Sequence, residues 1–216
     1  MDVKILYDNE AMEGFRRGWG FSCLVGEKLL FDTGADLNTL LFNVHRFNVN
    51  LDKIDKIIFS HEHGDHTGGF QIIELLRKVK VYLPKSFSRH FKNKISSFPN
   101  VELIEVSKLE EIDDNIFTTG ELGFLIKEQS LIVKTNRGLT VIAGCSHPGL
   151  EKILKIASKL GKIYGVVGGF HGFNKLEILR GIDLIVPCHC TARKREIRML
   201  YPDSSVKCSA GYRIEI

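Results

Sequence analysis

Apolar runs rich in Val, Ile, Leu and Phe recur along the chain, and turn residues separate them. Short continuous runs predict buried strands, whereas apolar residues that recur every three or four positions predict helices. This pattern predicts strands at residues 3–7, 22–25, 28–31, 54–60, 79–83, 101–105, 115–119, 128–135, 139–143, 163–167 and 182–187. It predicts helices at residues 70–78, 86–95, 150–159, 176–181 and 193–200. Strands predominate early and alternate with helices later, which favours an α/β (α+β) fold whose sheets are covered by helices.

Two local features bear on the organisation of the chain. No linker rich in Pro, Gly or Ser splits it, so we expect a single domain over residues 1–216. Gly26-Glu27 separates the second and third predicted strands and is typical of a two-residue hairpin loop.

The composition narrows the class of protein. With 216 residues, of which 44% are hydrophobic and 26% charged, the chain has a globular mixture that excludes a disordered or coiled-coil plan. Lys and Arg outnumber Asp and Glu by 30 to 26, and the net charge of +4 favours a small anionic substrate over a nucleic acid. No apolar run approaches the roughly 20 residues that a membrane helix requires, so we expect no membrane partner.

The cysteine count and the first residues indicate a compartment. Five cysteines are an odd number, and free thiols in a reducing cytosol are the simplest interpretation. The N-terminus enters a strand-like pattern directly, without a signal peptide. We therefore expect a cytoplasmic protein.

The strongest chemical signal is the segment 60–69, Ser-His-Glu-His-Gly-Asp-His-Thr-Gly-Gly, directly after a predicted buried strand. In a tight loop, His61 and His63 can turn toward one point, and Asp65 and His66 toward a second point beside it. Imidazoles with one carboxylate suit Zn²⁺ and other borderline divalent ions. A polar loop with solvated histidines is the alternative, and the rarity of this spacing disfavours it.

Titratable residues also follow other predicted strands, namely Asp32, Cys145, His147, His171 and His189. Open α/β sheets bind ligands at the carboxyl ends of their strands, so we expect these side chains to gather at one edge with the histidine loop. Each of these histidines taken alone is equally well explained by packing or capping, and this alternative stays strongest for His171.

The cysteines beside these histidines are expected to differ in role. If the stretch around His189 is extended, side chains alternate, so His189 faces the site while Cys188 and Cys190 face away from it. Cys145 lies two residues before His147 and would face the same side, which leaves a thiolate ligand open.

Together these motifs resemble the metallo-β-lactamase-fold superfamily. The closer resemblance is to its branch of metal-dependent hydrolases (superfamily II), which includes an archaeal dihydropterin–arylamine synthase of methanopterin biosynthesis. The resemblance implies a four-layer αββα sandwich with a metal site at one edge. It also implies that His61 and His63 bind a first metal, and that Asp65, His66 and His189 bind a second. The segments that carry it are 18–22, 30–34, 60–69, 118–121, 128–131, 144–149, 168–171 and 187–191.

Two departures from the superfamily pattern bear on the metal. The usual Thr-Pro-Gly-His reads Thr-Thr-Gly-Glu at residues 118–121, and the usual Gly-Asp reads Gly-Cys at Cys145. His147 is the natural substitute for the missing imidazole, and Glu121 and Cys145 are candidates as ligands or as supporting residues. Without a bridging carboxylate we expect one ion, or two of unequal affinity, with Zn²⁺ preferred and Mn²⁺, Fe²⁺ or Mg²⁺ as alternatives.

The resemblance implies a metal-dependent hydrolase that acts on a small phosphate-containing or ester-type substrate through a metal-bound water. Asp65 would bind metal and orient or deprotonate the water, and His171 would contact a phosphate or serve as acid or base. Asp32 is expected to hydrogen-bond the loop or a ligating histidine. The alternative is a transferase that joins a dihydropterin methyl diphosphate to an arylamine ribofuranosyl phosphate in methanopterin biosynthesis. A metal-binding nucleic-acid module ranks third, because the chain has no concentrated basic stretch.

Two further segments are candidates for contact with substrate or with a second subunit. Arg16 and Arg17 belong to a loop that the resemblance places over the metal edge, where they would meet a phosphate and Trp19 would stack on a planar ring. Solvated arginines and a packed Trp19 are the alternatives. Residues 84–99 suit a lid or the contact of a homo-oligomer, although ordinary helix packing is favoured.

Overall fold

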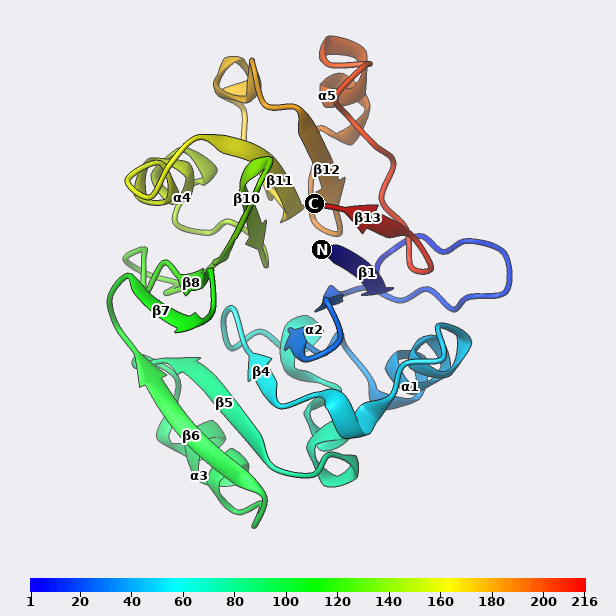
Figure 1. Cartoon of the computed structure of the whole chain (residues 1–216), viewed down its shortest axis with the longest axis vertical. Helices are drawn as coiled ribbons and strands as arrows, with labels where there is room; N and C mark the ends of the chain where they lie inside the picture. The colour runs from blue at the N-terminus through cyan, green and yellow to red at the C-terminus, as the bar shows by residue number, and fades with distance from the viewer. The chain divides into compact units, whose positions relative to one another are not determined.

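The computed structural model describes residues 1–216 and divides into two compact units, each built on one β-sheet (Figure 1). The first unit comprises residues 1–106 and 209–215, and the second comprises residues 107–208 and 216. Two sheets accompanied by helices confirm the predicted mixed α/β class. The single domain expected from the sequence stays a prediction.

The sheet of the first unit has seven strands in the order β13-β1-β2-β3-β4-β5-β6. These strands are β1 (Asp2–Tyr7), β2 (Ser22–Val25), β3 (Leu29–Phe31), β4 (Lys56–Ile58), β5 (Val79–Pro84), β6 (Val101–Val106) and β13 (Arg213–Glu215). The pairs from β13 to β3 are antiparallel, whereas β3, β4, β5 and β6 are parallel neighbours. Because parallel neighbours end at the same edge, the loops that follow β3 and β4 lie side by side.

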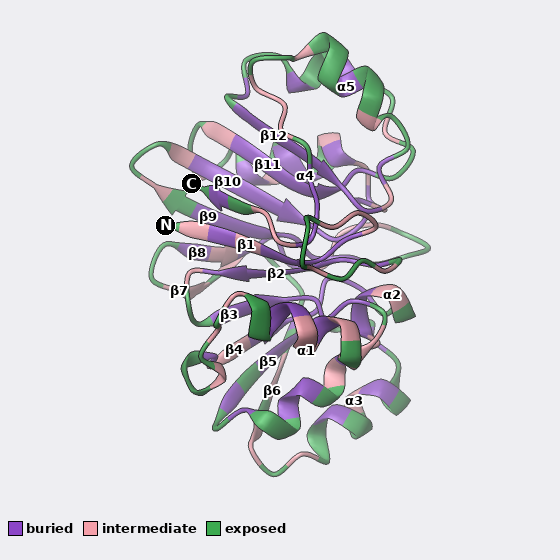
Figure 2. Cartoon of the chain, turned by 90° about the vertical axis from the view of Figure 1, so that its right-hand side faces the viewer, coloured by how far each residue is buried: buried purple, intermediate pink, exposed green.

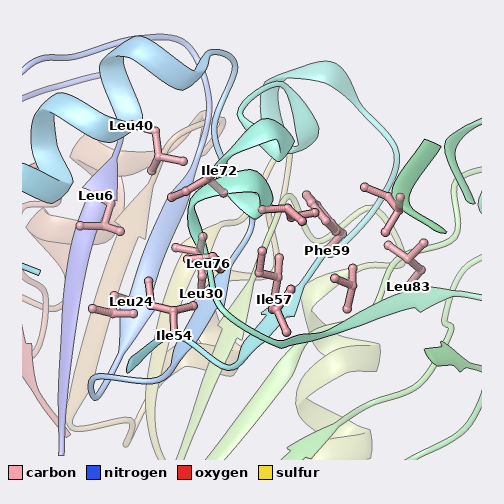
Figure 3. Packing of buried hydrophobic residues seen from close by; sticks show 14 of the residues in the cluster. Leu6, Leu24, Leu30, Leu40, Ile54, Ile57, Phe59, Ile72, Leu76 and Leu83 are labelled. Atoms are coloured by element: carbon pink, nitrogen blue, oxygen red, sulfur yellow. The ribbon is translucent and has the colours of Figure 1, made fainter. Parts of the chain in front are cut away.

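Helices of the first unit bury apolar side chains against this sheet. They are α1 (Leu37–Arg46), α2 (Gly64–Thr67), α3 (Arg89–Ser96) and the 3₁₀ helices η1 (Leu51–Lys53) and η2 (Phe70–Leu75). Leu40 of α1 and Ile72 of η2 belong to the same core as the strand residues Leu30 and Ile57 (Figure 3). All four side chains are fully buried, and burial of each contributes roughly 1.5–3 kcal/mol before the entropy cost of folding.

Helix α1 was not predicted from the sequence, although its apolar residues have helical spacing. Between Leu37 and Val44 they recur at i, i+3, i+4 and i+7. Interspersed Asn and Thr residues, which are poor helix formers, obscured this pattern. The side chain of Asp36 caps the helix by accepting a hydrogen bond from the Thr39 N–H.

The segment 84–99 packs as an ordinary helix. In α3, Phe91 and Ile95 are buried in the core of the first unit, and Phe87 before the helix is buried with them. Figure 2 shows buried and exposed stripes alternating around α3, as expected of a helix with one side on a core.

Residues 70–78, expected as an amphipathic helix, form instead the shorter η2. The Asn100 side-chain amide donates to the carbonyls of Ile73 and Leu76 at 2.8 and 3.0 Å. These carbonyls would otherwise accept bonds from the next helical turn, so the helix stops at Leu75.

The sheet of the second unit has six strands in the order β12-β11-β10-β9-β8-β7. These strands are β7 (Glu110–Asp113), β8 (Ile116–Thr118), β9 (Leu131–Thr135), β10 (Gly138–Ala143), β11 (Ile163–Gly169) and β12 (Leu184–Cys188). The strands β7 to β10 pair antiparallel, and β10, β11 and β12 are parallel neighbours. Three loops therefore leave one edge of this sheet together.

The second unit has its own core and helices. The helices are α4 (Leu150–Ala157), η3 (Leu176–Leu179) and α5 (Lys194–Leu200). Ile153 and Leu154 of α4 pack in one cluster with Val141 and Val166 of the sheet. The helices lack the combination of length and hydrophobicity that a membrane span requires.

Two strands and one loop differ from the sequence-based expectation. Strand β7 was missed because Glu-Glu-Ile-Asp is largely charged and partly exposed at a sheet edge, and β13 was missed because it is three residues long. The expected two-residue hairpin loop has three residues, 26–28, since Val25 pairs with Leu29.

Candidate metal centre

In the first unit, the parallel pairing of β3 and β4 brings the predicted acid and the histidine loop together. Asp32 directly follows β3, and His61 and His63 follow β4. Helix α2 begins at Gly64 and carries Asp65 and His66 back toward the same point. Neighbouring parallel strands thus supply the predicted donors of this unit at one edge.

The three imidazoles of the loop lie against one another. The ring centroids of His61 and His63 are 4.6 Å apart, and those of His61 and His66 are 4.3 Å apart. A carboxylate oxygen of Asp65 lies 4.0 Å from Nε2 of His66. His61 and His66 are buried and His63 is exposed, so the group lies at the surface of the first unit's loop region. Three imidazoles and one carboxylate form a donor set that suits Zn²⁺.

Asp32 fixes the orientation of two of these rings. Its Oδ1 accepts from the Ser60 N–H, and its Oδ2 accepts from the Ser60 hydroxyl and from Nδ1 of His66, each at 2.7 Å. Because the Ser60 hydroxyl proton points to Asp32, Nδ1–H of His61 donates to the Ser60 oxygen at 2.9 Å. Both rings then carry their proton on Nδ1, and Nε2 is the atom that would bind a metal.

Close backbone contacts hold this loop in place. The Thr33 N–H donates to the His66 carbonyl at 2.7 Å. A Cβ at Gly68 would lie 2.0 Å from the Ala35 carbonyl oxygen, so only glycine allows α2 to approach the segment after β3 this closely. The Asp32 backbone itself is left-handed, with φ of +54°, a conformation that Asp and Asn tolerate better than most residues.

In the second unit, three parallel strands deliver the remaining predicted residues. Cys145 and His147 follow β10, His171 follows β11 and His189 follows β12. The ring centroids of His147 and His171 are 5.1 Å apart. His171 is exposed, whereas His189 is buried. The predicted gathering of these loops at one edge therefore holds within this unit.

Glu128, which the sequence analysis placed at the start of a strand without a role, organises the loop of His147. This buried carboxylate accepts from the backbone N–H groups of Cys145, Ser146 and His147 at 2.9 Å each. Its Oε2 also lies 2.9 Å from Nδ1 of His147, which makes Nε2 the ligand atom of that ring. Its sequence neighbours, Lys127 and Gln129, are polar, so the sequence carried no signal that this carboxylate is buried.

Cys190 lies differently from the expectation, because it does not face away from His189. Its Sγ is 3.2 Å from Sγ of Cys145, and both sulfurs and a ring nitrogen of His189 lie within 4.8 Å of one another. The alternation of an extended strand does not apply here, since β12 ends at Cys188 and His189 has a left-handed φ of +42°. Cys188 does lie away from this group, and its thiol donates to the Val186 carbonyl.

The thiol pair has an electrostatic consequence. The hydrogen bond with Cys145 lowers the pKa of Cys190 from 9.0 to about 6 against the opposing effect of burial, and His189 and His171 add to the lowering. None of the five cysteines forms a disulfide.

The sequence profile of the metallo-β-lactamase superfamily matches residues 22–154, more than half of the chain. The chain belongs to the metallo-β-lactamase superfamily. Membership implies a divalent-metal protein, and the two sheets with their helices agree with that fold.

Similar proteins within and around this superfamily differ in chemistry. The 7,8-dihydropterin-6-methyl-4-(β-D-ribofuranosyl)-aminobenzene-5′-phosphate synthase of Methanocaldococcus jannaschii is 28% identical over 230 residues, which cover 80% of this chain and 78% of that protein. The solved structure of Tm1679, a metal-dependent hydrolase of the β-lactamase superfamily, is 28% identical with a TM-score of 0.84 and covers 100% of this chain and 99% of that one. The Zn²⁺-bound PqqB of Methylobacterium extorquens, 11% identical with a TM-score of 0.65 and full coverage of both chains, shares the fold alone.

Two of the remaining candidate residues of this metallo-β-lactamase-fold chain, Glu121 and Arg16, have local partners. Glu121 pairs with Lys127 at 3.6 Å. The Arg16 guanidinium stacks over the Phe42 ring at 4.0 Å. Arg17 and Trp19 are exposed, with 64% of Trp19 accessible to solvent.

Proposed function

We propose that the chain is a metal-dependent hydrolase that acts on a small phosphate-containing or ester-type substrate. The observation that carries the proposal is the hydrogen-bonded group of Asp32, Ser60, His61 and His66, in which both imidazoles have Nδ1 engaged and Nε2 as the metal-binding atom. Carboxylates and hydroxyls that fix ring orientation in this way are the usual surroundings of metal-binding histidines.

The proposed metal ligands are five histidines and one carboxylate. They are His61, His63, Asp65, His66, His147 and His189. Imidazole-rich sets of this kind favour Zn²⁺, with Mn²⁺, Fe²⁺ and Mg²⁺ as alternatives, as one ion or as two of unequal affinity. When bound, such an ion would acidify a water molecule and polarise a phosphoryl or carbonyl oxygen.

The chain's own residues have distinct proposed roles. Asp65 accepts the proton of the attacking water, since its carboxylate is partly exposed beside His66. His171, exposed beside His147, binds the phosphate of the substrate or protonates its leaving group. Asp32 is buried and acts through His66 as a positioning residue.

Two general properties support the class of substrate and the compartment. The net charge of +4 favours an anionic substrate. The odd number of cysteines, five, without a disulfide favours a reducing cytoplasm.

A second candidate function is a transferase that joins a dihydropterin methyl diphosphate to an arylamine ribofuranosyl phosphate. In that reaction the arylamine nitrogen attacks the pterin methylene carbon and diphosphate leaves. The 28% identical synthase of Methanocaldococcus jannaschii supports it. The two functions differ in whether water attacks the substrate. A chain that binds an arylamine phosphate tightly, without hydrolysing activated phosphodiesters, would favour transfer.

Hydrolysis of bis(4-nitrophenyl) phosphate tests the proposal. We expect turnover that a chelator abolishes and Zn²⁺ or Mn²⁺ restores. The His63→Ala variant should lose at least about 100-fold in turnover, since removing a ligand weakens metal binding by several kcal/mol, while circular dichroism shows an unchanged fold because His63 is exposed. His90→Ala, which removes an exposed histidine of α3, is the matched control and should keep full activity. Full activity of His63→Ala would refute the proposed metal chemistry.

Metal binding should also stabilise the folded chain. At a free Zn²⁺ concentration of 100 times the dissociation constant, we expect a gain of about 2.7 kcal/mol. For a chain of 216 residues this corresponds to a rise in melting temperature of roughly 5–10 °C. Thermal unfolding of the chelated and reloaded protein measures it, and a gain that is unchanged in His63→Ala would exclude His63 as a ligand.

A further inference from the structure

An exposed apolar loop lies beside His147. This apolar loop, residues 123–126, carries Phe124 and Leu125 with 90% and 91% of their surface accessible to solvent. Exposing such large apolar side chains to water is energetically unfavourable, so an exposed apolar pair of this kind indicates a binding surface.

The apolar loop has a defined shape. Leu122 and Glu128 exchange two backbone hydrogen bonds of 2.9 Å at its base. Gly123 has a φ of +101°, and a Cβ there would lie 2.4 Å from the Ile126 carbonyl oxygen, so the turn is too tight for any other residue. The loop is therefore held in a tight turn that presents its apolar tip.

The base of the apolar loop is tied to the segment that carries His147. Glu128, whose backbone closes the loop, uses its carboxylate to bind the N–H groups of Cys145 to His147. The same residue thus fixes the tip of the loop and the imidazole relative to each other.

A pocket of about 360 Å³ lies between these parts. The apolar loop lines one side, and His147, Pro148 and Lys152 line the other. This volume is within the usual range of small-molecule sites. Lys152 brings positive charge to the pocket, because the neighbouring carboxylate of Glu151 is paired with Lys175 at 2.8 Å.

We propose that this pocket binds the flat apolar part of an aromatic anion, with the ring against the apolar loop and Pro148 and the negative charge toward Lys152. The proposal rests on the proposed function, since it places the apolar part of the substrate beside a proposed metal ligand, His147. The aromatic ring of Phe124 favours a planar ring as its partner, and the flexible cationic side chain of Lys152 favours a phosphate, sulfonate or carboxylate.

Two fluorescent dyes of matched shape test the proposal on the full chain without turnover. Anilinonaphthalene sulfonate is an aromatic anion, and N-phenyl-1-naphthylamine is its neutral counterpart. Each is titrated into chelated protein, so dye binding is independent of hydrolysis. We expect saturable binding of the anion at one site per chain.

Two matched pairs of variants locate the site. Phe124→Ala/Leu125→Ala should weaken both dyes by about tenfold, whereas Met199→Ala/Leu200→Ala, which removes an exposed apolar pair of α5, should change them less than twofold. Lys152→Ala should weaken only the anionic dye, by about threefold, and Lys155→Ala on the same helix should weaken neither. All six substitutions in these four variants replace exposed side chains, so the fold should persist.

Several results would overturn the inference. These are the absence of saturable binding, an equal effect of the Met199/Leu200 control, or an equal effect of Lys152→Ala on both dyes. A dimer that Phe124→Ala/Leu125→Ala dissolves in sedimentation would assign the apolar loop to a second copy of the chain and would equally overturn it. If the pocket does not bind the dye, chelator-sensitive hydrolysis can still be observed. If the chain does not hydrolyse phosphodiesters, the dye can still bind, so the two experiments distinguish the two proposals.

Discussion

Replacing Glu128 with alanine is expected to lower the free energy of unfolding by about 4 kcal/mol. The buried carboxylate accepts three backbone N–H bonds, from Cys145, Ser146 and His147, and a fourth from the His147 ring. Without it, these donors stay inside the protein with no acceptor, and each such donor costs roughly 1–3 kcal/mol. Chemical denaturation measures the loss, and hydrogen exchange at the amides of residues 145–147 locates it.

Two further variants test whether the loss of stability comes from the lost hydrogen bonds of Glu128 or from any loss of a carboxylate in this region. Glu128→Gln keeps the shape and one acceptor oxygen, so we expect about half the loss. Glu121→Gln removes a partly exposed carboxylate that pairs with Lys127 at 3.6 Å and should change stability by less than about 0.5 kcal/mol. Equal stabilities of the Glu128 and Glu121 variants would contradict the assigned role of Glu128.

Replacing Asp32 with alanine is expected to lower the free energy of unfolding of the first unit by about 4 kcal/mol. The change removes the acceptor of the Ser60 N–H, the Ser60 hydroxyl and Nδ1 of His66, all of them buried. It also places alanine in a left-handed conformation with φ of +54°, which adds roughly 1 kcal/mol. Denaturant unfolding measures the sum.

The variant Asp32→Asn isolates the role of Asp32 in orienting His66. Asparagine tolerates the left-handed backbone and keeps one acceptor oxygen, so about half of the lost stability should return. It no longer offers a carboxylate to His66, and Zn²⁺ affinity should fall by about 10- to 100-fold in competition with a chelating dye. Asp52→Ala, which removes an exposed partner of Arg77, is the control for both measurements. Unchanged Zn²⁺ affinity of Asp32→Asn would contradict the positioning role.

Much of the first unit's site was predictable because its parts are local. His61, His63, Asp65 and His66 lie within six consecutive residues after a buried strand, so a single loop places them together. The place of Asp32 beside the histidine loop was also predictable. Asp32 follows β3, and the histidine loop follows the parallel neighbour β4, so both lie at the same edge of the sheet. The helical spacing in α1 was equally present in the sequence and was missed in its interpretation.

The roles of several residues in the second unit became clear only from the tertiary structure. The role of Glu128 arises because its side chain reaches a loop 17 residues further along the chain, and no local pattern encodes that contact. Cys190 joins Cys145 because the chain turns at His189 with a left-handed backbone, which a strand-like reading of the stretch does not anticipate. The apolar loop drew no attention in the sequence, since Phe124 and Leu125 look like core residues until their exposure is known.

The sequence alone determined the mixed α/β class, most strand positions and the histidine loop, because periodicity and short-range spacing report local burial and local geometry. Only the tertiary structure decided which strands are neighbours, which buried donors Glu128 satisfies, and which apolar side chains stay in water. Those outcomes depend on strand order and on contacts between distant segments, and a pattern of hydrophobic and polar positions does not specify either.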